Sequence, residues 1–84
     1  MTLHFTIRLY GRYRDAARSE TITLQLEEEK SIQDVLDAFV KLFPVFAKDA
    51  RHMMVSKNGV LSAHDAPLQH SDQVAIAPPV VSGG

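Results

Sequence analysis

The residues of this chain best suited to chemistry lie at its C-terminal end, where a carboxylate follows two glycines. The last seven residues are Pro78-Pro79-Val80-Val81-Ser82-Gly83-Gly84. Proline has no backbone N–H, so a strand that reaches Ala77 is expected to end there. Glycine has no Cβ, so the last two residues can enter a slot too narrow for other side chains. This composition favours a tail that presents one carboxylate to another protein's active site. The alternative is a frayed end without a role.

The chemistry available to such a tail begins with activation of the Gly84 carboxylate, which is a poor electrophile. Adenylation by a partner would create a mixed anhydride with a good leaving group, and a sulfur donor could then convert it to a thiocarboxylate. Seven extended residues span at most roughly 25 Å, so the tail could enter a deep pocket while the domain docks outside. The two prolines would stiffen the tail and reduce the entropy lost on insertion.

The remaining polar residues do not predict a second site. The four histidines lack the spacing of convergent metal ligands: His4, His52, His64 and His70. We therefore expect no metal site. Gly11 and Gly59 stand alone and do not form a glycine-rich phosphate loop. Four arginines lie close together and could contact an acidic partner or a nucleotide, although such residues often serve only solubility: Arg8, Arg12, Arg14 and Arg18.

Length and composition limit the classes of function. A chain of 84 residues forms one domain with a small core. It has 9 basic and 10 acidic residues, a balance that argues against a nucleic-acid partner. No apolar run is long enough to span a membrane, and Met1 to His4 does not resemble a signal peptide, so we expect a cytoplasmic protein. Without cysteine the chain has no thiol, so any sulfur it handles must come from elsewhere.

Two strands are predicted in the first third of the chain. Apolar and polar residues alternate over residues 3–10, which is typical of a half-buried strand. Gly11 ends this pattern, and residues 12–19 form a polar connection, with a helical turn possible at residues 14–17. Alternation returns from Thr21 to Leu26 and predicts a second strand, paired with the first as a wide hairpin.

A helix and three further strands follow. Ser31 is a good N-cap, Asp34 can return the capping bond, and Pro44 should stop the helix near Phe43. Apolar residues at helical spacing form one face: Ile32, Val35, Leu36, Phe39, Leu42 and Phe43. Residues 45–51 are expected to cross back irregularly. A strand over residues 52–57, the Asn58-Gly59 turn, a return strand from Val60 and a last strand at residues 74–77 complete the pattern.

This order of elements predicts an α+β fold of the β-grasp (ubiquitin-like) type. A mixed sheet of four to five strands would be covered on one face by one main helix, which crosses between the second and third strands. A ferredoxin-like arrangement ranks second because residues 63–72 are poor material for a second helix. The domain would span residues 1–77, and residues 78–84 would form an extended Gly-Gly tail.

The chain resembles the small subunits of molybdopterin synthase, a family of ubiquitin-like sulfur carriers. The resemblance runs through residues 5–17 (FTIRLYGRYRDAA), the helix from Ser31, the Lys57-Asn58-Gly59 turn, the Pro67-Leu68 segment and residues 74–84 (VAIAPPVVSGG). A terminal Gly-Gly alone is shared with other carriers and modifiers, whereas Pro-Pro-Val followed by Ser-Gly-Gly is more specific. Three residues depart from the family pattern: Arg18 and Ser71 replace glycines, and Ala77 replaces an aromatic residue.

The resemblance implies a function for the tail. A ubiquitin-activating-like enzyme would use ATP to adenylate Gly84, a sulfur donor protein would supply the thiocarboxylate, and the sulfur would build the dithiolene of molybdopterin from cyclic pyranopterin monophosphate. The large subunit of the synthase would supply the catalytic side chains, so this chain would bind no cofactor itself. The expected partner-binding residues are those of the tail: Pro78, Pro79, Val80, Val81, Ser82 and Gly83.

Three other functions stay open at this point. A protein modifier would join Gly84 to a lysine through an isopeptide bond. A carrier for another product would deliver sulfur to the thiazole of thiamine or to a transfer RNA base. A plain β-grasp interaction domain would have an inert tail.

Overall fold

A computed structural model describes residues 3–27, 31–69 and 71–79. Its first two strands show the alternation of buried and exposed side chains that the sequence predicts. The elements in chain order are β1 (Leu3–Leu9), α1 (Gly11–Ala17), β2 (Thr21–Leu26), α2 (Ile32–Leu42), the 3₁₀ helix η1 (Pro44–Asp49), β3 (Met54–Lys57), β4 (Val60–Leu61) and β5 (Val74–Ala77).

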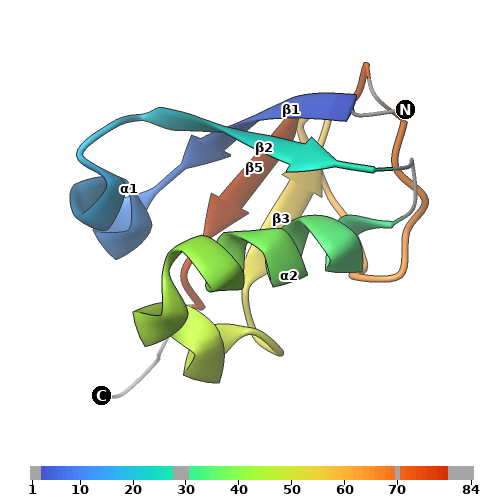
Figure 1. Cartoon of the computed structure of the whole chain (residues 1–84). Helices are drawn as coiled ribbons and strands as arrows, with labels where there is room; N and C mark the ends of the chain where they lie inside the picture. The colour runs from blue at the N-terminus through green and yellow to red at the C-terminus, as the bar shows by residue number, and fades with distance from the viewer. Residues whose placement is uncertain (1–2, 28–30, 70, 80–84) are drawn as a thin grey trace.

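The five strands form one mixed sheet in the order β2-β1-β5-β3-β4. β1 and β5 are parallel, and the other neighbouring pairs are antiparallel. Helix α2 lies across one face of this sheet (Figure 1). The predicted β-grasp architecture, with a mixed sheet and one main helix between the second and third strands, is therefore confirmed.

Side-chain alternation in β1 and β2 separates a core face from an open face. Phe5 pairs with Leu24 on the side that packs under α2, and Thr6 pairs with Thr23 on the opposite side. Ile7 and Leu9 are also fully buried, as a period of two requires. The predicted hairpin of these two strands is confirmed, with α1 in its connection.

Helix α2 begins and ends where its local signals place it. The Asp34 carboxylate accepts a hydrogen bond of 2.9 Å from the backbone N–H of Ser31, which is the returning half of the capping box. The helix ends at Leu42, two residues before Pro44. Its apolar face supplies four buried residues to the core: Ile32, Val35, Leu36 and Phe39.

Two connections are more regular than their sequences predict. Residues 11–17 form a complete helix, α1, where only a turn at residues 14–17 was expected. Residues 44–49 form η1, where an irregular crossing was expected. Both segments bury one aromatic side chain, Tyr13 in α1 and Phe46 in η1, and these rings pack 4.5 Å apart between centroids. Tertiary contact stabilises helical turns that would be marginal in isolation.

The aromatic cluster formed by Tyr13, Phe39, Phe43 and Phe46 joins α1, α2 and η1. The ring of Phe39 lies 5.2 Å from that of Tyr13 and 6.1 Å from that of Phe46. These separations suit favourable aromatic pairs. The cluster continues into the apolar core beneath the sheet, so in the described residues the three helices and the sheet share one core.

The Asn58-Gly59 turn is confirmed, and it is tied to the start of β5. Both residues have positive φ angles, 55° and 84°, as a type I′ turn requires. The Asn58 side chain donates to Asp72 at 2.9 Å and accepts from the backbone N–H of Gln73 at 2.9 Å. The hairpin of β3 and β4 is thereby fixed against the strand that leads to the tail.

Arg18 is strained at the C-terminus of α1, because its φ of 55° lies in the left-handed region that favours glycine. We expect Arg18→Gly to raise the free energy of unfolding by about 0.5–1 kcal/mol, measured by urea denaturation. Arg18→Ala is the matched control, since it removes the same side chain but keeps the Cβ. Equal stability of the two variants would contradict the explanation based on strain.

Candidate functional site at the root of the tail

The tail leaves the domain from a central strand. β5 lies between β1 and β3, and residues 77–79, here called the tail root, follow its last core residue, Ile76. The backbone N–H of Tyr10 donates to the carbonyl oxygen of Ile76 at 3.2 Å, so the end of β1 is fastened beside the exit of the tail. In Figure 1 the tail root points away from the sheet at the end of the molecule where α1 and η1 lie.

Gly11 makes room for the tail root at the start of α1. A Cβ on this residue would lie 3.0 Å from Pro78 Cγ and 3.3 Å from Pro78 Cδ, closer than nearly all real contacts. The φ of Gly11 is also positive, at 58°, which a residue with a side chain adopts only with strain. Gly11 and Pro78 therefore fit together, and this contact fixes the direction in which the chain leaves β5.

The structure covers part of the predicted site. Pro78 and Pro79 are half-buried and follow β5 directly, so the predicted end of the strand at Ala77 is confirmed. The other predicted tail residues, Val80, Val81, Ser82, Gly83 and Gly84, lie outside the described residues. The carboxylate at Gly84, the roles assigned to the tail and the division into domain and tail stay predictions.

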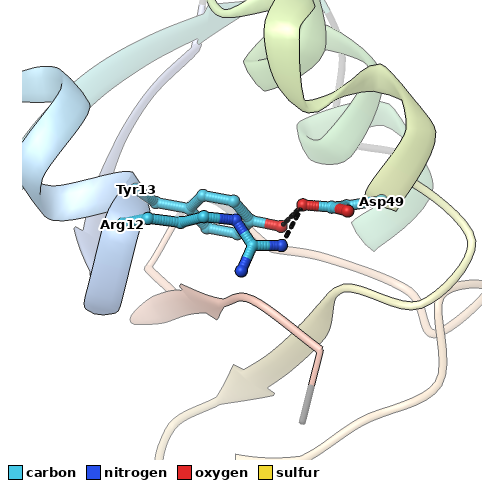
Figure 2. Close-up of polar contacts among 3 residues, drawn as sticks. All are labelled: Arg12, Tyr13 and Asp49. Carbon is cyan, nitrogen blue, oxygen red and sulfur yellow. Dashed lines mark hydrogen bonds and ion pairs between the residues drawn. The ribbon is translucent and has the colours of Figure 1, made fainter. Parts of the chain in front are cut away.

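Next to the tail root, three side chains link α1 to η1. Arg12 and Tyr13 run side by side from α1 toward Asp49 at the end of η1, as Figure 2 shows. One carboxylate oxygen of Asp49, Oδ2, accepts from the Arg12 guanidinium at 2.6 Å and from the Tyr13 hydroxyl at 2.9 Å. The Arg12 guanidinium carbon also lies 5.5 Å from the centre of the Tyr13 ring.

The electrostatics of these three groups fix their protonation. The Arg12 guanidinium and the Tyr13 hydroxyl donate to Asp49, so the pKa of its carboxyl lies below the usual 3.8. Burial, and then the hydrogen bond to Asp49, raise the pKa of the Tyr13 phenol, which stays a neutral donor. Sequence reasoning missed this group because Tyr13 and Asp49 are 36 residues apart and share no local pattern.

Stability should depend on pH through Asp49. A carboxyl whose pKa is lower in the folded than in the unfolded protein stabilises the fold above its unfolded pKa, and this contribution is lost as the pH falls through the folded pKa. We expect the advantage of the wild type over Asp49→Asn in free energy of unfolding to shrink as the pH falls from neutral to below 3.8. Urea denaturation across this range measures it, and a constant difference would contradict the assignment.

The four arginines do not share one role. Arg8 lies on the open face of the sheet, 5.7 Å from the centre of the Tyr10 ring. Arg12 is paired with Asp49, and Arg18 caps α1. Arg14 is in the last turn of α1, where a cation suits the helix dipole. Each of the four therefore has a structural environment of its own, and a role for them in binding stays a prediction.

The histidines lie apart from this site as far as they are described. His4 and His52 are exposed, and His64 is half-buried with its Nε2 2.7 Å from the carbonyl oxygen of Met53. His70 lies outside the described residues. Over residues 3–27, 31–69 and 71–79 there is no group of three or more histidine, aspartate or glutamate side chains placed to hold a metal ion. In the same residues, no helix has the length and apolar character needed to cross a bilayer.

The sheet order, the single covering helix and a tail that leaves the central strand define a ubiquitin-like β-grasp domain. Comparison with known proteins gives the family. The model of the ThiS family matches residues 7–84, and the chain belongs to this family of ubiquitin-like sulfur carriers.

Curated relatives come from two kinds of protein. The molybdopterin synthase sulfur carrier subunit of Arabidopsis thaliana is 28% identical over 83 residues, which cover 99% of this chain and 85% of the relative. Small archaeal modifier protein 1 of Haloferax volcanii is 31% identical over 85 residues, which cover 92% of this chain and 97% of the relative.

Solved structures share the fold. The crystal structure of the Haloferax volcanii modifier superposes with a TM-score of 0.76 at 25% identity, covering 93% of this chain and 99% of that one. A complex of subunits 1 and 2 of molybdopterin-converting factor from Helicobacter pylori gives a TM-score of 0.59 at 17% identity, covering 96% of this chain and 100% of that one.

Proposed function

We propose that this protein is the small, sulfur-carrying subunit of a molybdopterin synthase. The observation that carries the proposal is the family match, which extends through the whole tail to Gly84. The relative from Arabidopsis thaliana, a molybdopterin synthase sulfur carrier subunit, supports this branch of the family. The tail root adds support, because Pro78 lies against Gly11 at the end of a central strand, where the tail begins.

The proposed chemistry takes place at one carbonyl carbon. A Gly84 carboxylate oxygen attacks the α-phosphorus of ATP, which releases pyrophosphate and leaves an acyl adenylate. A sulfide-level sulfur from a donor protein attacks the carbonyl carbon, the bond to the phosphate oxygen breaks, and AMP leaves. The product is a thiocarboxylate, whose sulfur then attacks an electrophilic carbon of the pterin precursor and displaces an oxygen leaving group from it. Water attacks the Gly84 carbonyl and breaks its bond to sulfur, so the sulfur stays on the pterin and the carrier returns to its carboxylate.

The proposal assigns the catalytic side chains to partners. A synthase large subunit receives the tail and acts on the pterin substrate. An adenylating enzyme binds ATP and a sulfur donor protein supplies the sulfur, so this chain itself holds no cofactor. In this proposal the protein works in the cytoplasm. A solved neighbour of the same fold is a complex of two molybdopterin-converting factor subunits, which supports the large subunit as a partner. The nearly balanced charge does not favour nucleic acid as a further partner.

Intact-mass analysis of the protein from its native cell tests the proposal. We expect a population with one oxygen replaced by sulfur at Gly84, and fragmentation should place the change at the last residue. A strain lacking the gene should lose molybdoenzyme activity and keep thiamine synthesis. A protein without any sulfur adduct, or further encoded residues after Gly84 that are never removed, would contradict the assignment.

A second function is favoured by the likeness to the archaeal modifier, which is 31% identical. A modifier and a sulfur carrier share the adenylation step and differ in the nucleophile that attacks the activated carbonyl. A lysine amine would give an isopeptide bond to another protein. Blotting native extracts for conjugates separates the two functions, since heavier species that disappear on removal of Gly84 would support the modifier.

Val80 tests the expected interface with the large subunit, which the last strand and the tail would form. Val80→Asp should weaken binding by at least about tenfold, because a charge would be buried without a partner. Calorimetry with the purified large subunit measures the affinity. Val60→Asp on β4 is the control, because Val60 is 66% exposed and lies in another strand. Normal affinity of the Val80 variant would refute this interface.

A further inference from the structure

A groove runs along the side of the molecule, between the edge strand β2 and helix α2. It has a volume of about 650 Å³, within the range of sites that hold ligands. β2 ends the sheet on this side, whereas the tail leaves from β5, with β1 in between. The groove is therefore separate from the tail root. Its two walls, β2 and α2, lie side by side in Figure 1.

The edge of β2 offers backbone hydrogen bonds. Leu9 donates to the carbonyl oxygen of Glu20 at 2.8 Å, and the antiparallel register continues from this pair. Because hydrogen-bonded positions alternate, Ile22 and Leu24 direct their backbone groups to β1, while Thr23 and Gln25 direct theirs outward. Within the described residues, the backbone groups of these two outward positions have no partner on the far side. Such an edge is a template for one more strand.

The wall of the groove offers apolar contact beside this edge. Leu24 and Leu26 of β2 line it together with Ala38 and Leu42 of α2. Leu42 is 57% exposed, although it lies on the apolar side of its helix. A strand added at β2 would turn every second side chain toward these residues, because side chains alternate across a strand.

The net negative charge of the groove lining favours a basic binding partner. Three carboxylates line it, those of Glu27, Asp34 and Asp37, against one ammonium group at Lys41. Asp34 accepts from Ser31, and Asp37 accepts from Gln33 at 2.9 Å. These contacts involve no basic side chain, so among the described residues the lining keeps a net negative charge, with three carboxylates against one ammonium group. A second copy of this chain, paired edge to edge, would bring the same carboxylates together, and like charges in that position are unfavourable.

We propose that this groove binds an extended segment of a partner protein in which every second side chain, on the face toward α2, is apolar and basic in turn. The segment adds a strand to β2, and on this one face its apolar side chains contact Ala38 and Leu42 while its basic side chains face the carboxylates of α2. This binding does not depend on the tail chemistry proposed above. Since β1 separates β2 from β5, the groove and the tail can be occupied at the same time.

Titration of the full-length ¹⁵N-labelled protein with a synthetic valine-lysine peptide, in which valine and lysine take every second position in turn with threonine between them, tests the proposal. We expect saturable changes in amide shifts at Thr23, Gln25 and Ala38, with β3 and β4 at the other side of the sheet unaffected. The same peptide with glutamate in place of each lysine is the charge control, and it should bind at least about tenfold more weakly. Equal affinity of the two peptides, or shifts at β3 and β4 instead, would overturn the proposal.

Two variants distinguish the contribution of the apolar groove residues to binding from that of the backbone edge of β2. Leu42→Ser should weaken binding of the valine-lysine peptide by about fivefold, while the matched control Leu61→Ser, at a leucine 66% exposed on β4, should leave it unchanged. Thr23→Pro removes an outward N–H, which an edge strand tolerates, and should abolish binding.

Equal effects of the two leucine variants would overturn the groove as the binding site. Full binding by a folded Thr23→Pro protein would overturn strand addition. Sedimentation of the protein without peptide gives a last check. A dimer that Thr23→Pro dissociates would make a second copy the occupant, and would also overturn the proposal.

Discussion

Deletion of Gly84 is expected to abolish sulfur transfer while the domain stays folded. The deletion moves the terminal carboxylate back by about 3.5 Å. A displacement of about 1 Å can cost 10²-fold in rate, so transfer should fall below 1% of the wild-type rate. Transfer to the pterin precursor in the assembled synthase measures the loss, and pyrophosphate release by the adenylating enzyme shows whether activation fails first. The melting temperature should be unchanged, because a terminal residue contributes little to stability.

Ser82→Ala is the matched control for this deletion. It changes a tail side chain but keeps the length of the tail and the carboxylate on glycine, so transfer should stay close to that of the wild type. A deletion variant that transfers sulfur at the wild-type rate would contradict a role for the chain terminus, and would favour an interaction domain with an inert tail.

The largest effect on stability is expected at Phe39, at the centre of the aromatic cluster. This side chain is fully buried and packs against the rings of Tyr13, Phe43 and Phe46. Phe39→Ala removes the ring from α2 and leaves a cavity that its neighbours cannot fill, so it should lower the free energy of unfolding by about 3–5 kcal/mol. Urea denaturation measures the loss. In a small domain with a thin margin, much of this variant should be unfolded at physiological temperature.

Phe43→Ala is the control for Phe39→Ala, because Phe43 belongs to the same cluster but is only partly buried. Its truncation should cost clearly less, since solvent can fill part of the space. Equal losses would contradict the central position of Phe39. The comparison also bears on the tail, because the cluster holds α1 against the core, and the first residue of α1 is Gly11, against which Pro78 packs.

The elements predicted from sequence are those that carry their own signals. β1 alternates over its whole length, α2 has a cap at Ser31 and a stop at Pro44, and the Asn58-Gly59 turn needs two positive φ angles. Each of these preferences acts within a few residues, so it can be read without knowledge of the rest of the chain. The resemblance of residues 74–84 to ubiquitin-like sulfur carriers agrees with the ThiS family model, which matches residues 7–84.

The sequence by itself determined the type and order of the main elements and the family, because period, caps and turn chemistry are local. Only the tertiary structure decided that α1 and η1 are helical, that Asp49 receives both Arg12 and Tyr13, and that Gly11 accommodates Pro78. It also placed the groove between β2 and α2. These features depend on contacts between residues far apart in the chain, and such contacts form only when the sheet order brings them together, which no local preference encodes.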